Sequence, residues 1–187
     1  IQKLFFRTQL ILIISMALIL GVAGTLINIH FETEKRDQNL QNVAEAIANS
    51  PMMTGKSSEE ENVIIEYLDA LKDTLDDIDV ISVVNNDGIR MYHSNHALIG
   101  TKYDGNMPDF ISNTDGYYAV DESGPSGNQR RAYAAVYNEN GEYVGVVMAI
   151  MLMKNIKTET VQMLFIFLLI TVVAILIELI IAGELSG

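Results

Sequence analysis

Two uncharged apolar runs, one near each end, restrict what this 187-residue chain can fold into. They cover residues 10–29 and 161–177 and contain no ionisable side chain. A helix rises about 1.5 Å per residue, so roughly 20 apolar residues cross the hydrocarbon core of a bilayer. The first run has that length. The second has it when it extends to Ile181, which places Glu178 near the end, where an acid reaches the headgroups. Both runs therefore predict membrane-spanning helices.

The charges beside the first run predict the orientation of the chain. Lys3 and Arg7 precede this run, and basic residues accumulate on the cytoplasmic side of membrane spans. We therefore expect a two-pass cell-membrane protein with an extracytoplasmic central domain. The first span would cover residues 9–29 and the second span residues 161–181, with the central domain at residues 30–160 between them. Residues 1–8 would be the cytoplasmic N-terminus, and residues 182–187 a cytoplasmic stub. The alternative for the first run is a cleaved signal peptide that ends near residues 22–24.

The strong acidity of the chain excludes some partners. The net charge is −12, from 12 basic and 24 acidic residues. This balance argues against nucleic acid or an anionic lipid surface as a partner. Cysteine is absent, and a domain of about 130 residues can bury enough core to fold without disulfides. The few basic residues between the two runs therefore become the informative ones.

Between the runs, helical periodicity comes first and strand periodicity follows. Apolar spacing predicts a helix over residues 30–50 that continues the first span without a break and stops before Pro51. Ser58 and Glu61 have capping-box spacing and open a second helix that reaches about residue 75. Strands are predicted over residues 80–84, 89–94, 117–122, 129–137 and 143–151, with turns at 86–88, 123–128 and 138–141. This order predicts an α+β domain with one antiparallel sheet and helices on one face.

Residues typical of catalysis or metal binding are sparse. The chain has no Cys, no Gly-rich phosphate loop, and no Ser/His/Asp set in a recognisable context. His93 and His96 have HxxH spacing but lack a helix and a nearby acidic third ligand. We therefore expect no enzyme activity, metal or cofactor within this chain. The acidic residues between 69 and 79 are interpreted as a solvated face, with cation bridging to lipid headgroups as the alternative.

Two adjacent arginines in the fourth predicted strand must point in opposite directions. Successive residues of a strand face opposite sides of the sheet. Arg131 therefore shares a face with Tyr133, whereas Arg130 lies on the other face. One of these arginines must point toward the helices or into a pocket. The basic residues between positions 80 and 150 are Arg90, Lys102, Arg130 and Arg131.

A third arginine and a histidine lie in the second predicted strand. Arg90 and His93 are three residues apart, so they converge only if the strand ends or kinks near Tyr92. Two guanidinium groups, a protonated imidazole and backbone N–H groups of a glycine turn form a natural cage for carboxylates. The alternative is that the arginines pair with local acids, and the residues alone leave both interpretations open.

Five short motifs occur in order between residues 41 and 151. They are VAEAIANSP at Val43–Pro51, Arg90-x-x-His93, Ile99-Gly100-x-x-Tyr103-x-Gly105, Gly124-x-x-Gly127-x-x-x-Arg131, and Val144-Gly145-Val146-Val147. In this order and spacing, with apolar runs on both sides, the chain resembles the sensor half of the citrate/C4-dicarboxylate sensor histidine kinases. The resemblance implies a PAS-like (PDC) domain: a five-stranded antiparallel sheet with a long N-terminal helix, flanked by two transmembrane helices.

The resemblance also implies roles for individual residues. Arg90, His93 and Arg131 would hold ligand carboxylates, and Tyr103 would form an aromatic pocket wall. Tyr133 falls where citrate sensors tend to carry Lys and dicarboxylate sensors an aromatic residue, which favours a C4-dicarboxylate such as malate. Two residues depart from the family pattern, Arg130 in place of an apolar residue and the acidic Asp104. Backbone donors would come from Gly127 and Asn128.

The same resemblance implies partners that lie beyond this chain. The parent would be a histidine kinase whose catalytic module is absent here, so these residues should neither bind ATP nor autophosphorylate. Its output would pass to a response regulator. We expect a homodimer that pairs along Leu40, Val43 and Ile47, and a ligand-driven shift of the second span. The alternatives are another ligand, such as an amino acid or a divalent cation, and a chemoreceptor as parent.

Overall fold

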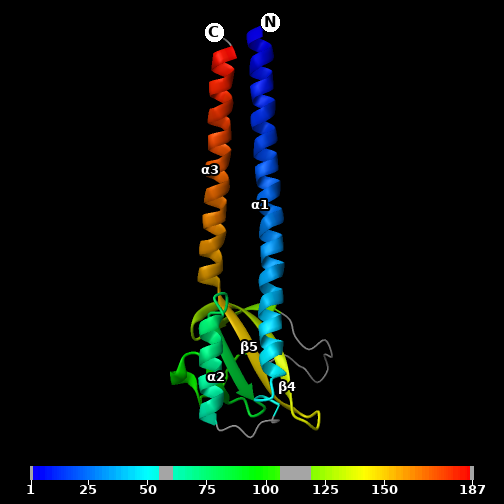
Figure 1. The fold of residues 1–187 in the computed structure, drawn as a ribbon, viewed down its shortest axis with the longest axis vertical. Helices are drawn as coiled ribbons and strands as arrows, with labels where there is room; N and C mark the ends of the chain where they lie inside the picture. The colour runs from blue at the N-terminus through cyan, green and yellow to red at the C-terminus, as the bar shows by residue number, and fades with distance from the viewer. Residues whose placement is uncertain (1, 55–60, 106–118, 186–187) are drawn as a thin grey trace. The chain divides into compact units, whose positions relative to one another are not determined.

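A computed structural model describes residues 2–54, 61–105 and 119–185. Figure 1 shows the elements, which in chain order are α1 (Gln2–Ala48), α2 (Glu61–Thr74), β1 (Val80–Asn85), β2 (Arg90–His93), the 3-10 helix η1 (His96–Leu98), β3 (Ala119–Gly124), β4 (Gly127–Tyr137), β5 (Tyr143–Leu152) and α3 (Met153–Leu185). Residues 34–156 form one compact unit, and the helical segments before and after it form another.

The two long helices contain the apolar runs. α1 is unbroken from Gln2 to Ala48, which confirms the predicted continuity, and it ends before Pro51. α3 begins directly after β5. Two segments of these helices are long and apolar enough to cross a membrane, Arg7–Ala48 and Met153–Ile181. Their large apolar side chains are mostly exposed, which is the surface that a bilayer would cover.

The five strands form one antiparallel sheet in the order β2-β1-β5-β4-β3. The α+β class and the antiparallel sheet are therefore confirmed. Three hairpins connect neighbours along the chain, and the pairing of β1 with β5 joins the first hairpin to the last strand. This pairing places β2 and β4 on either side of the central β1 and β5. Side chains from both can therefore meet above the middle of the sheet.

The predicted turn over residues 123–128 is too long. β3 continues to Gly124 and β4 begins at Gly127, and these two glycines pair across the hairpin. Only residues 125 and 126 remain between the strands. Gly127 has a φ of 101°, which a glycine adopts without strain. The predicted starts of the second helix at Ser58 and of the third strand at residue 117 lie outside the described residues.

One face of the sheet packs against α1 and α2. Leu40, Ala44 and Ile47 of α1 form a buried cluster with strand residues, and Figure 1 shows α2 on the same side of the sheet as the end of α1. Leu40 and Ile47 are 0% and 1% exposed. The prediction that two copies of the chain pair along Leu40, Val43 and Ile47 is therefore wrong, because this face of α1 is covered by the sheet of the same chain. The sheet itself needs this apolar stripe to cover its own buried side.

The opposite face of the sheet has a second cluster, in which neither α1 nor α2 takes part. Tyr133, Met148 and Val84 are among its buried members, and Tyr103 packs against it. Burial on both faces explains why β5 is an almost continuous apolar strand without alternation.

Candidate functional site

A β-bulge in β2 places Arg90 and His93 on the same face. Tyr92 pairs with Val83 of β1 and Arg90 pairs with Val84, so Met91 has no partner in the register. Such an extra residue bends the strand and shifts the alternation of side chains by one. Arg90 and His93 are consequently both buried, at 6% and 3% exposure, whereas Met91 points outward. The sequence required a kink near Tyr92, and the bulge supplies it.

The register across the sheet identifies this face as the one away from the helices. His93 lies opposite Ser82, which lies opposite Met148, and Met148 lies opposite Tyr133 of β4. Directly paired residues of antiparallel strands share a face. His93 and Tyr133 are therefore on one side of the sheet together with Arg131, two residues before Tyr133. The structure thus brings the predicted cations onto a single buried face.

Arg131 is buried at 2% exposure and makes many contacts. Its Nε donates to Gln129 Oε1 at 2.8 Å, and its Nη2 donates to the Ser123 carbonyl at 3.1 Å. Its Nη1 lies 2.9 Å from the Tyr103 hydroxyl and 3.3 Å from Glu122 Oε2. The distance to Glu122 is longer than a typical charge-assisted hydrogen bond. One nearby acid thus partly neutralises Arg131, as the alternative interpretation predicted.

Arg90 has a different environment. Its Nη1 donates to Thr101 Oγ1 at 2.8 Å and to the Lys102 carbonyl at 2.7 Å. The guanidinium carbon lies 5.3 Å from the centre of the Tyr103 ring, a cation–π geometry. Within the described residues Arg90 forms no ion pair with a carboxylate. A buried charge held by neutral groups alone is costly, so this site favours an anion.

His93 is neutral in this structure near neutral pH. Burial, together with the positive charges of Arg90 and Arg131, lowers the pKa of His93 to about 4. Asn95 N–H donates to Nδ1 at 2.9 Å, so the neutral ring carries its proton on Nε2 and can donate from there. This corrects the expectation of a protonated imidazole. The neutral ring therefore supplies one donor, its Nε2–H group.

Two tyrosines complete the cluster. The hydroxyls of Tyr103 and Tyr133 both accept hydrogen bonds from Arg131, at 2.9 and 3.4 Å. Tyr133 is buried, and burial raises the pKa of its hydroxyl, which therefore stays protonated. A Cβ atom at Gly105 would collide with the Tyr103 ring. The Tyr103-x-Gly105 motif therefore has a steric reason in this fold.

Gly127 and Asn128 are placed differently from the other predicted residues. Both are exposed at the start of β4, and in the described part of the chain no hydrogen bond joins them to Arg90, His93 or Arg131. The Asn128 side chain accepts a hydrogen bond from Ser123 Oγ at 2.8 Å. The two residues hold the hairpin, and their role as backbone donors to a ligand stays a prediction.

Two residues of this face, Ser82 and Gln129, were missed by the sequence analysis. Ser82 is 2% exposed, and its hydroxyl has no hydrogen-bond partner in the described residues. The sequence pattern that could have revealed Ser82 is a single polar residue on the same strand face as the apolar Val80 and Val84. Gln129 is equally buried and orients Arg131. Gly124, by contrast, was part of a predicted motif, and the structure places it against the guanidinium of Arg131, where a Cβ atom would collide.

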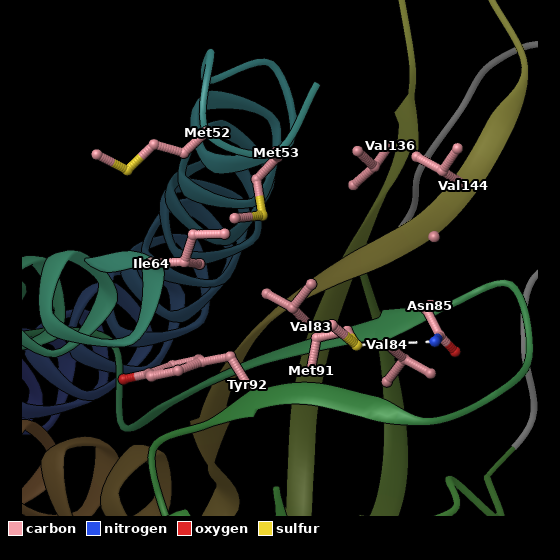
Figure 2. A pocket seen from close by; sticks show the side chains of 11 residues that line it. Met52, Met53, Ile64, Val83, Val84, Asn85, Met91, Tyr92, Val136 and Val144 are labelled. Atoms are coloured by element: carbon pink, nitrogen blue, oxygen red, sulfur yellow. Dashed lines mark hydrogen bonds between the residues drawn. The ribbon is translucent and has the colours of Figure 1, made fainter. Parts of the chain in front are cut away.

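A separate cavity lies on the helix side of the sheet and does not suit an anion. It has a volume of about 200 Å³. Figure 2 shows its lining, which is mostly aliphatic or methionine side chains and includes Met53, Ile64, Val83 and Met91. Asn85 and Tyr92 contribute the polar side chains, and no basic residue lines it. The cavity therefore offers a carboxylate no cation, whereas the opposite face contains Arg90 and Arg131.

Metal binding finds no support in the described ranges. They contain no group of three or more His, Cys, Asp or Glu side chains suited to hold a metal ion. Asp69 instead accepts hydrogen bonds from Tyr92 at 2.7 Å and from His96 at 2.9 Å. Desolvation raises the pKa of Asp69, but these two hydrogen bonds and the charge of His96 outweigh it, so the pKa is lowered. This contact ties β2 to α2.

Comparisons with known proteins locate the fold. No protein-family model matches the sequence, and no curated protein matches it. The sensor domain of DcuS from E. coli has 20% identity and a TM-score of 0.50, and the match covers 68% of this chain and 98% of that one. The sensor domain of the histidine kinase DctB from V. cholerae has 15% identity and a TM-score of 0.54, with coverages of 73% and 57%.

An extracellular ligand binding receptor from Desulfohalobium retbaense is also similar, with 14% identity and a TM-score of 0.51. That match covers 68% of this chain and 24% of the receptor. Together with the strand order, these likenesses confirm the predicted PAS-like sensor-domain fold. Identities this low establish the fold alone.

Proposed function

We propose that this chain is the receptor part of a membrane-anchored sensor, and that it binds a small C4-dicarboxylate such as malate. The main support is that Arg90, His93 and Arg131 are all buried on the same face of the sheet. Arg90 has only neutral partners among the described residues, and Arg131 has a long contact with one acid. A ligand carboxylate would compensate the buried charge and use the planar fork of each guanidinium.

Charge balance favours two ligand carboxylates over three. Two arginines and Glu122 give this face a net charge of about +1 while His93 is neutral. A dicarboxylate would bring that sum to −1, and uptake of one proton by His93 would return it to zero. A third carboxylate would be left without a cation, because Tyr133 stands where a lysine could have supplied one.

The placement of the chain in the membrane follows from the same proposal. Residues 9–29 and 161–181 would cross the bilayer, with residues 1–8 and 182–187 in the cytoplasm and residues 30–160 outside. β5 leads directly into α3, so movement of this strand would reach the second span. The protein would act as a homodimer, with a histidine kinase module beyond the second span that signals to a response regulator.

Calorimetry on the whole chain in lipid nanodiscs tests the ligand class. We expect L-malate, succinate or fumarate to bind, and citrate to bind more weakly. Arg131→Ala should lower the affinity about 10- to 100-fold, the usual value of hydrogen bonds to a charged group. Arg130→Ala, on the opposite face, is the matched control. Binding of an amino acid alone would favour the same fold with another ligand, and a response to no carboxylate would overturn the proposal.

A further inference from the structure

The arginine next to the proposed ligand arginine contacts α1. Arg130 lies on the helix side of β4, and its guanidinium meets the carboxylate of Asp37. Nε donates to Oδ1 at 2.9 Å and Nη2 donates to Oδ2 at 2.6 Å, which is a bidentate pair. The two side chains are 23% and 25% exposed. The contact joins residues that are far apart in the chain, within the compact unit of residues 34–156.

Geometry distinguishes this pair from an ordinary surface salt bridge. Exposed single ion pairs contribute little, but a bidentate, partly buried pair fixes both partners. The hydrogen bonds to Asp37 raise the pKa of Arg130, which therefore keeps its charge. Asp121 of β3 is a weaker partner of the same guanidinium, with one contact at 3.1 Å and a side chain that is 62% exposed. The strong contact is thus the one to α1.

The start of α3 is attached to a different strand. Asp79, directly before β1, accepts a hydrogen bond from the Leu152 backbone N–H at 2.7 Å and another from Asn155 Nδ2 at 2.7 Å. A carboxylate at the first turn of a helix is also favoured by the helix dipole. Besides the apolar packing of α1 on the sheet, polar contacts therefore connect the sheet to α1 through Arg130 of β4, and to α3 through Asp79 beside β1.

We propose that Arg130 and Asp37 form a coupling pair that transmits movement of β4 to α1. This inference rests on the proposed function, in which Arg131 holds the ligand. Arg130 and Arg131 are neighbours in one strand, so a ligand that draws Arg131 toward Arg90 and His93 of β2 also moves the backbone that carries Arg130. Asp37 lies about two turns beyond residue 29, where the first apolar run ends. Ligand binding would thus act on the membrane helices through two separate attachments.

A disulfide reporter between the membrane helices can measure this coupling. The chain has no native Cys, and Asn28 Nδ2 of α1 lies 3.1 Å from Met163 Sδ of α3. Asn28→Cys with Met163→Cys in the whole chain in nanodiscs reports the disulfide formation rate, with and without L-malate. Asp37→Asn and Arg130→Gln should each reduce the ligand-induced rate change about fivefold or more, which is the lower end of typical coupling between sites. L-malate affinity should stay within about twofold.

The rate of disulfide formation measured without ligand tests the coupling pair independently of the proposed ligand. Asp37→Asn and Arg130→Gln should change it alike, and the double variant should add nothing further because both remove the same contact. The charge-reversed pair, Asp37→Arg with Arg130→Asp, should restore the unmodified rate. Asp121→Asn removes the other partner of Arg130 and should leave the rate unchanged. If L-malate fails to bind the unmodified chain, the ligand proposal fails while this basal test remains. Equal basal rates in all variants would overturn the coupling pair.

Discussion

His93 should make the domain sensitive to mild acid. The pKa of His93 is about 4 in the folded domain because of burial and the nearby Arg90, whereas the pKa of a histidine in an unfolded chain is about 6.5. The unfolded chain therefore binds more protons between these values, and stability is lost as the pH falls through this window. The pKa difference corresponds to a loss of about 3 kcal/mol once the pH is below both values, of which about 2 kcal/mol falls between pH 7 and pH 4.5.

Urea unfolding of residues 34–156 at these two pH values would measure this loss. His93→Gln keeps a neutral hydrogen-bonding side chain and removes the titration, so it should lose about 2 kcal/mol less than the unmodified domain. Acidic residues also titrate in this range, and the comparison between the two proteins subtracts them. Equal losses in both proteins would refute the reasoning. NMR is a direct check, since the fragment contains only two histidines, His93 and His96.

Ligand binding should reverse this pKa shift. A dicarboxylate beside His93 favours the imidazolium, so its pKa should rise on binding. L-malate binding near pH 6 should then take up a fraction of a proton, and affinity should increase as the pH falls from about 7 to about 5.5, by at most tenfold per unit. Calorimetry in buffers of different ionisation enthalpy counts the protons. No proton uptake would mean that the ligand leaves the imidazole neutral.

Three substitutions test the geometry of the site further. Arg131→Ala should weaken L-malate binding about 10- to 100-fold and Arg130→Ala should not, and equal effects in calorimetry would mean that the assignment of strand faces is wrong. Deletion of Met91 should preserve binding, because it removes the bulge and leaves Arg90 and His93 two positions apart on one face; loss of binding in calorimetry would contradict this. Gly124→Ala should weaken L-malate binding, because the new methyl group would displace the guanidinium of Arg131; an unchanged affinity in calorimetry would contradict this.

The elements of the fold could be predicted because their signals are local. The apolar runs, the absence of Gly and Pro between the first run and Pro51, and the β-branched segments are each visible within a few residues. The opposite orientation of Arg130 and Arg131 follows in the same way from strand alternation. The five strands and the unbroken α1 were therefore within reach of the sequence.

The site itself depends on which strands are neighbours. The sequence showed that Arg90 and His93 can share a face only if the strand is kinked. The kink itself arises from the pairing of β2 with β1, which leaves Met91 without a partner. The low pKa of His93 arises from burial beside Arg90, on a face that only the assembled sheet defines. A protonated His93 imidazole was expected because residue type alone suggests a pKa of about 6.5.

Helix partners were the least predictable feature. The apolar stripe of Leu40 and Ile47 fits a second copy or a sheet equally well by periodicity, and the tertiary structure buries it against the sheet. The pairing of Arg130 with Asp37 has no local signal, because acidic residues are abundant and any of them could have been the partner. Periodicity determines which face of an element is apolar, whereas the contact that satisfies each charge is determined by strand order and register. Those are properties of long-range pairing that no short stretch of sequence contains.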